Sequence, residues 1–200
     1  MSVTARKEFL RLLETLKHEG TTVVELICGT ATPDPWRLYP GEYGVFDRTT
    51  SSQFYFHAHG HEAREVGHFH TVRLFSDHTV HLVAISMATD GWPQALFTLN
   101  LWAIGDAEAT AAELKRYVRR FRIDPGRGSP RVVRFVNLMF RAFEAEIERL
   151  QDEKIATLAA YRRARPGADP LEDRGLEVLS SVELDNQLTV GRRARFVQRT

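Results

Sequence analysis

Apolar and polar residues alternate along the N-terminal segment with the period of a helix. Phe9, Leu12, Leu13 and Leu16 fall on one face, with charged residues between them, which predicts an amphipathic helix over residues 4–18 that ends at Gly20. The following stretch, residues 21–27, is rich in β-branched side chains and predicts a strand.

Strand patterns dominate residues 53–102. Residues typical of strands follow one another over 53–59, 68–75, 79–87 and 94–102. Between the last two segments stands Ala88-Thr89-Asp90-Gly91-Trp92-Pro93, whose Asp-Gly pair is typical of a tight hairpin turn. We therefore expect an antiparallel sheet region over about residues 53–102.

A helical period returns over residues 106–164. Asp106 is a candidate N-cap for a first helix, which ends at Asp124-Pro125-Gly126, and Ser129-Pro130 begins a second. That second helix carries a continuous apolar seam with steps of three and four residues: Val133, Val136, Phe140, Phe143, Ile147 and Leu150. Such a seam allows a homodimer through the long helix 130–152.

The order of these elements predicts an α+β fold in one domain over residues 1–200. A mostly antiparallel sheet of five or six strands packs against an N-terminal helix and two central or C-terminal helices. The loop over residues 29–44 carries three prolines and is long enough to form a binding wall. Residues 176–184 and 194–197 could be edge strands or a loosely packed extension.

Composition narrows the functional classes. The chain has 200 residues, 43% of them hydrophobic and 26% charged, with a net charge of +1 at pH 7, so no overall bias favours nucleic acid or anionic membranes. No apolar run reaches the ~20 residues of a membrane span, and the N-terminus lacks a signal-peptide core. A single cysteine, Cys28, fits a reducing compartment. We expect a cytoplasmic protein that acts on a small molecule.

Seven of the eight histidines are concentrated between residues 57 and 81. Because alternate side chains on a strand point to one side, the pairs His57/His59 and His68/His70 each present two imidazoles on a common face. Residues 60–67 between the pairs are polar and bounded by glycines, as in a turn, so a hairpin would bring all four imidazoles together. Imidazole is the commonest protein ligand for transition metals, and this pattern predicts a metal site.

Other residues complete the predicted site. Glu65 or Glu62 supplies a carboxylate from the turn, and Glu65 is the candidate general base or fifth ligand. A histidine-rich shell with one carboxylate suits Fe, Cu, Zn, Ni or Mn better than Ca or Mg. The predicted cofactor-binding side chains are Tyr55 on the first histidine strand and Asn100 and Trp102 on the last strand.

The remaining histidines have ordinary interpretations beside functional ones. His61 lies in the turn and is either solvent-facing or functional, whereas His78 follows a turn signal and belongs to the surface. His81 alternates with apolar residues, which indicates a neutral core histidine or a further ligand. His18 complements the C-terminal end of the first helix.

The histidine stretch resembles several known patterns in part. It is similar to the cupin motif in its HxH pair (His57, His59) followed by a glutamate, although the next histidine, His68 or His70, follows sooner. HAHGHEA resembles the motif of histidine-triad nucleotide hydrolases except at its glutamate, and HxHxHE resembles the HxHxDH of metallo-β-lactamase-fold hydrolases with acid and histidine exchanged. The chain as a whole resembles a family of uncharacterised bacterial proteins with HxH, GHFH, HLVAIS and LFTxNxW segments, which implies no activity.

These observations favour a metal-dependent enzyme with His57, His59, His68 and His70 as ligands of a divalent transition metal (Fe, Cu or Zn). Redox chemistry is slightly favoured over hydrolysis because all-histidine shells suit iron and copper. Two alternatives stay open. One is a metal- or haem-binding protein without catalysis, and the other, implied by the histidine-triad resemblance, is a nucleotide hydrolase that uses His57, His59 and His61.

Overall fold

The computed structural model describes residues 3–29, 33–35, 37–59, 65–104, 107–184 and 188. In this part of the chain seven strands form one antiparallel sheet with the order β1-β3-β4-β5-β6-β7, and β2 also pairs with β3. The strands are β1 (Leu38–Tyr39), β2 (Val45–Asp47), β3 (Ser52–Ala58), β4 (Glu65–Leu74), β5 (Thr79–Ala88), β6 (Pro93–Leu99) and β7 (Val178–Glu183). Together with the helices, this sheet confirms the predicted α+β class.

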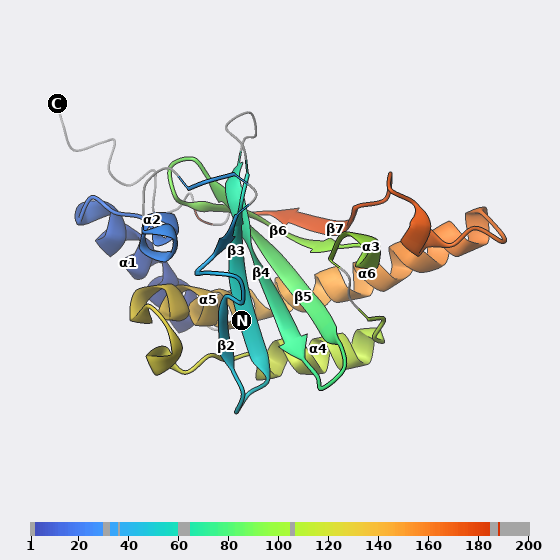
Figure 1. Ribbon diagram of the computed structural model, residues 1–200, viewed down its shortest axis with the longest axis horizontal. Coiled ribbons are helices and arrows are strands. Elements are labelled where there is room, and N and C mark those ends of the chain that lie inside the picture. Colours follow the sequence, from blue (N-terminus) through green and yellow to red (C-terminus); the bar gives the residue numbers. More distant parts are fainter. Residues whose placement is uncertain are drawn as a thin grey trace.

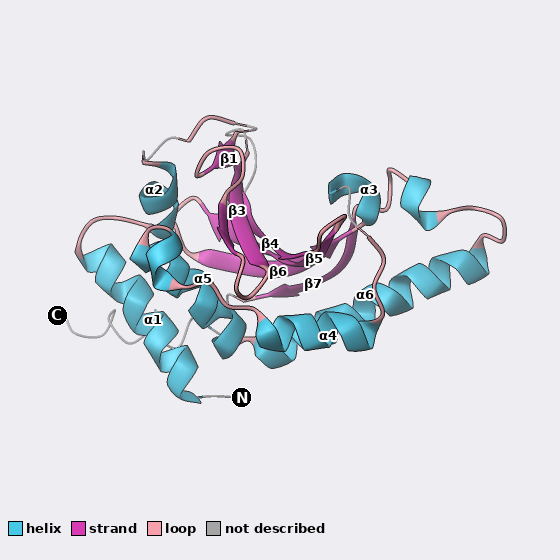
Figure 2. Ribbon diagram, turned by 60° about the horizontal axis from the view of Figure 1, so that its bottom comes forward, coloured by secondary structure: helices cyan, strands magenta, loops and turns pink. Residues whose placement is uncertain are grey.

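Helices lie along one face of the curved sheet and at its ends (Figures 1 and 2). The longer ones are α1 (Val3–His18), α4 (Ala111–Arg120), α5 (Pro130–Ala142) and α6 (Glu144–Ala164), and the shorter ones are α2 (Val23–Cys28) and α3 (Leu101–Ile104). Figure 2 shows α5 and α6 following one another beneath the strands, with α4 alongside α6 and α1 packed on α5. Within the described residues, no helix is both long and apolar enough to cross a membrane.

Aromatic side chains connect the sheet to the helical layers. Phe69 on β4 contacts Phe135 on α5 with ring centroids 5.5 Å apart, and Phe135 contacts Phe9 on α1 at 5.4 Å. On β3, Phe54 and Phe56 are fully buried on the helix-facing side of the sheet. Burial of each such ring contributes about 1.5–3 kcal/mol. Because strand residues alternate, the intervening side chains of β3 face away from the helices.

The segment predicted as a strand over residues 21–27 is the helix α2. Thr22 accepts a hydrogen bond from the backbone N–H of Glu25, and the Glu25 carboxylate accepts one from the backbone N–H of Thr22. This capping box satisfies two backbone donors at the start of the helix, and the buried side of α2 packs against α5. Local capping and packing on α5 therefore outweigh the β-branched composition.

The long helix predicted from residue 130 is divided at Phe143. The backbone of Phe143 departs from helical geometry (φ −122°, ψ 24°), so α5 ends at Ala142 and α6 begins at Glu144. All six seam residues are at most 3% exposed within the chain's own core. A homodimer along residues 130–152 would therefore have to use another face of these helices.

Three further boundaries differ from the sequence prediction. The last strand of the histidine region ends at Leu99 and is followed by α3, because the side-chain amide of Asn100 caps this turn by accepting from the Leu101 N–H. Thr110 caps α4, whereas Asp106 lies outside the described residues. Of the two candidate C-terminal edge strands, the first contains β7, which pairs with β6, and residues 194–197 lie outside the described part.

Candidate metal centre

The pairing of β3 with β4 brings the histidine pairs together. His57 lies opposite His68, and Tyr55 lies opposite His70, so both histidine strands present these side chains on the sheet face away from the helices. Gly67 precedes His68 with φ +151°, and a Cβ there would stand 2.2 Å from the backbone oxygen of His57. The glycine therefore permits the close approach of the two strands beside the site.

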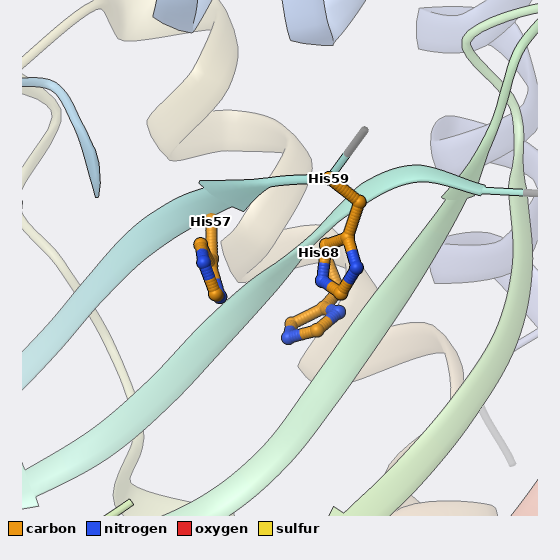
Figure 3. Close-up of side chains that lie close together, drawn as sticks. All are labelled: His57, His59 and His68. Atoms are coloured by element: carbon orange, nitrogen blue, oxygen red, sulfur yellow. The ribbon is translucent and has the colours of Figure 1, made fainter. Parts of the chain in front are cut away.

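Three imidazoles converge into a possible metal-binding set. His57 on β3, His59 just beyond its end and His68 on β4 each offer a ring nitrogen, and these atoms lie within 4.8 Å of one another. Figure 3 shows the three rings on the same side of the two strands. Nitrogen atoms around a tetrahedral zinc ion lie about 3.4 Å apart, given Zn–N bonds of roughly 2.0–2.1 Å. Small side-chain rotations would therefore close this set around an ion.

Glu65 supplies a carboxylate at the edge of the histidine set. Its Oε1 lies 3.0 Å from His68 Nδ1 and 3.7 Å from His59 Nε2, while its Oε2 accepts a hydrogen bond from Ser86. The side-chain amide of Gln94 in turn donates to Ser86 Oγ over 2.9 Å. Burial raises the pKa of Glu65, but the hydrogen bonds from His68 and Ser86 outweigh it and leave the pKa below its ordinary value. Glu65 is therefore a fixed carboxylate anion at neutral pH.

Two more imidazoles, those of His70 and His81, extend from His68 in a row. His70 Nε2 lies 2.9 Å from His68 Nε2, and His70 Nδ1 lies 3.3 Å from His81 Nε2, so the three rings form a hydrogen-bonded row. Tyr55 stacks on His70 with ring centroids 4.8 Å apart. His81 is fully buried, as expected of a core histidine. This row fixes the orientation of His68, much as outer hydrogen bonds orient metal ligands.

The environment favours the neutral form of four imidazoles of the cluster, those of His57, His59, His70 and His81. Burial, together with the neighbouring His68 and His59, lowers the pKa of His57 to about 4, and burial also lowers the pKa of His59. Burial lowers the pKa of His70 and that of His81 well below the ordinary histidine value. A neutral imidazole has a free lone pair and is the form that binds metal ions, so His57 and His59 are prepared for a ligand role at neutral pH.

A hollow on the same sheet face adjoins the histidine set. One row of register partners crosses five strands: His57, His68, Ser86, Ala95 and Glu183. The small side chains in the middle of this row, Ser86 and Ala95, leave space above the sheet. The hollow has a volume of about 470 Å³, and its lining includes Glu65, Ser86, Phe97 and Glu183. Phe97 contacts His68 edge-on, with ring centroids 5.2 Å apart. This hollow, which we call the trough, is large enough for a small molecule beside the imidazoles.

The structure brings some of the predicted site residues together and places others elsewhere. It brings His57, His59, His68, His70, Glu65 and Tyr55 together. Asn100 and Trp102 instead donate side-chain hydrogen bonds to the carbonyl of Leu176, and Asn100 also to that of Pro170, so they hold the segment before β7. They are not part of the histidine cluster, because β6 ends before them.

Other residues were missed or lie elsewhere. Sequence reasoning did not single out Ser86, Phe97 or Glu183, although the polar Ser86 within the apolar strand 79–87 was a signal for the first of them. His61 and Glu62 lie outside the described residues. His78 is exposed and bonds to Asp77, in agreement with its predicted surface position.

Comparisons with known proteins identify a family and no activity. The model of one protein family, described as a domain of unknown function (DUF6969), matches residues 3–184. No curated protein and no solved structure matches the chain.

Proposed function

The chain belongs to the DUF6969 family, whose description carries no activity, and we propose from the site itself that the protein is a metal-dependent enzyme acting on a small molecule. The metal would be a divalent transition ion of the Fe, Cu or Zn type, held by His57, His59 and His68. The substrate would lie in the trough.

The convergence of three imidazoles next to a carboxylate anion is the observation that carries this proposal. The ligand atoms of His57, His59 and His68 lie within 4.8 Å of one another, and Glu65 lies within 3.7 Å of two of these rings. Three histidines leave one position of a tetrahedral ion open, which is typical of catalytic rather than structural sites. A purely structural role would not require the adjoining trough.

Each residue of the site has a proposed task. His70 contacts His68 at Nε2 and Glu65 contacts it at Nδ1, so binding of the ion by His68 would require one of these two contacts to give way. Glu65 accepts a proton from bound water or substrate, or serves as a fourth ligand, and Ser86 fixes its second oxygen. When bound, the ion supplies Lewis acidity for hydrolysis or, as iron or copper, oxidation chemistry. Because the shell is rich in imidazole, redox chemistry is the slightly favoured of the two.

Elemental analysis of protein purified without a histidine tag tests the metal. We expect about one equivalent of iron, copper or zinc in the native protein, lost in His57→Ala and His68→Ala. His78→Ala is the matched control, because His78 is an exposed histidine outside the cluster. Metal retained by both cluster variants, or lost equally in His78→Ala, would refute the assignment of ligands.

Two further measurements separate the proposed enzyme from its alternatives. An intense Soret band in the absorption spectrum would indicate a haem protein instead, since a bare ion gives none. Glu65→Gln retains the side-chain size but removes the base, so loss of turnover with metal retained identifies Glu65 as a proton acceptor. Metal content and turnover that both survive this change would remove Glu65 from the mechanism.

A further inference from the structure

Positive charge is concentrated in one stretch of the helical layer, away from the histidines. Residues 115–141 contain nine of the chain's 27 lysines and arginines but only one of its 26 acidic residues, Asp124. This stretch comprises the second half of α4, the turn that follows it and nearly all of α5. Because the whole chain has a net charge of only +1, this concentration gives the molecule a strongly basic region.

Most of these basic side chains are paired with carboxylates. Lys115 pairs with Asp152 at 2.8 Å, and Arg119 makes two hydrogen bonds to Glu148. Three more arginines of the stretch lie within 4.0 Å of a glutamate carboxylate: Arg116, Arg131 and Arg141. In the described part of the chain, Arg120, Arg122 and Arg134 have no carboxylate within ion-pair distance.

Among the described residues, four arginines of the stretch have no carboxylate within ion-pair distance, and three of these line one hollow, while the fourth, Arg127, lies outside its lining. Arg120 on α4, Arg122 on the turn and Arg134 on α5 all border a groove of about 780 Å³, with Arg119 and Arg141 also on its wall. The three are exposed, so their guanidinium groups are accessible to a ligand. This groove, which we call the arginine groove, therefore gathers guanidinium groups whose charge is not neutralised by the protein.

We propose that the arginine groove binds a small molecule carrying two or more linked phosphate groups. Guanidinium presents its N–H groups in a planar fork that matches phosphate oxygens, and several forks around one hollow suit several adjacent phosphates. The volume of the groove lies within the range of small-molecule sites, roughly 300–1,000 Å³. The site is independent of the histidine cluster, which lies on the opposite face of the sheet.

The surroundings of the groove favour a small polyanion over a macromolecule. Its large apolar side chains, Phe121 and Leu138, are only 8% and 3% exposed, and its exposed apolar residues are Pro125 and Pro130, so it offers a protein partner no large apolar anchor of the kind on which interfaces depend. A nucleic acid would need an extended basic surface, yet the neighbouring Lys115, Arg116 and Arg131 are paired with carboxylates. Within this stretch, most of the arginines without a carboxylate partner thus lie at the hollow.

Isothermal titration calorimetry with inorganic triphosphate and with ATP tests the proposal, and orthophosphate serves as the comparison ligand. We expect both polyphosphates to bind at one site and more tightly than orthophosphate. Loss of one charged hydrogen bond weakens binding by about tenfold, so the triple variant Arg120→Gln/Arg122→Gln/Arg134→Gln should lose roughly 100-fold or more. The substituted side chains are exposed, and the variant is expected to fold, which a circular dichroism melt verifies.

Two controls locate the site. Arg149→Gln removes an exposed arginine of α6 outside the groove and should leave the affinity unchanged. His57→Ala removes a residue of the histidine cluster and should also leave it unchanged, which excludes binding through a metal. Equal weakening by Arg149→Gln, absence of binding by either polyphosphate, or tighter binding of a DNA duplex or anionic vesicles that the triple variant abolishes would overturn the proposal.

Discussion

Acid should destabilise the metal-free protein through His57. Burial, with His68 and His59 nearby, lowers the pKa of His57 from 6.5 to about 4 in the folded protein. In the unfolded chain the side chain regains its ordinary pKa, so between these two values the unfolded state binds more protons than the folded state. Neutral His57 therefore costs no stability above pH 6.5, and its contribution to the free energy of unfolding becomes unfavourable as the pH falls toward 4.

The size of the effect follows from the same two pKa values. At a pH of about 4.5, full expression of this shift would lower the free energy of unfolding by about 2.5 kcal/mol. His57 is only partly buried, and solvent screens such charges, so we expect about 1–1.5 kcal/mol from this residue. That amount is between about a fifteenth and a third of the stability of a typical domain of roughly 5–15 kcal/mol.

Urea unfolding with EDTA present measures this contribution when native protein is compared with His57→Gln at about pH 7 and 4.5. The glutamine variant has no titrating group at this position, so its stability should fall by about 1–1.5 kcal/mol less than that of the native protein, with an unchanged slope against urea. His78→Gln, which changes an exposed histidine, should follow the native protein. Parallel losses in native protein and His57→Gln would refute the reasoning and show that His57 protonates as easily when folded.

Three other outcomes are expected. Zinc at about 100 times its Kd should stabilise the native protein by about 2.7 kcal/mol, which raises the melting temperature of a 200-residue chain by about 6 °C. An equal rise in the melting temperature of His68→Ala would contradict the site. Gly67→Ala should lower the free energy of unfolding in urea by more than about 1 kcal/mol and impair metal binding, because the added Cβ would stand 2.2 Å from the backbone oxygen of His57. Native-like stability and metal binding would show that the strands can separate there freely. Thr22→Ala removes the hydroxyl that caps α2 at the Glu25 N–H and should cost about 1 kcal/mol by the same assay, whereas no loss would mean that packing alone forms α2.

Local pattern predicted those elements in which a single period extends over many residues. The helix over residues 4–18 and the strands on either side of residues 88–93 lie where periodicity placed them, within a few residues. Short segments were harder, because the six residues of α2 carry side chains that suit a strand equally well. There, a hydrogen-bonded cap and contact with α5 decide the conformation, and neither is a property of composition.

Part of the candidate site was also predictable. The spacing of His57/His59 and His68/His70 predicts two pairs of imidazoles on strand faces, and Glu65 stands out as a nearby carboxylate. Which histidines would bind the metal and which would support them was not predictable. This depends on the register, which sets His57 opposite His68 and places His70 where it hydrogen-bonds to His68. Asn100 lies away from the histidine cluster for a related reason, since alternation predicts a face only as far as the strand extends.

The sequence by itself determined the α+β class and the histidine-rich strands, because these depend on residue type and on spacing along the chain. The tertiary structure alone decided which imidazoles meet, that Ser86 fixes Glu65, and that Phe97 and Glu183 border the same hollow. It also decided that Arg120, Arg122 and Arg134 share one groove. Contacts of this kind join residues far apart in sequence, and only strand register and helix packing set the distances between them.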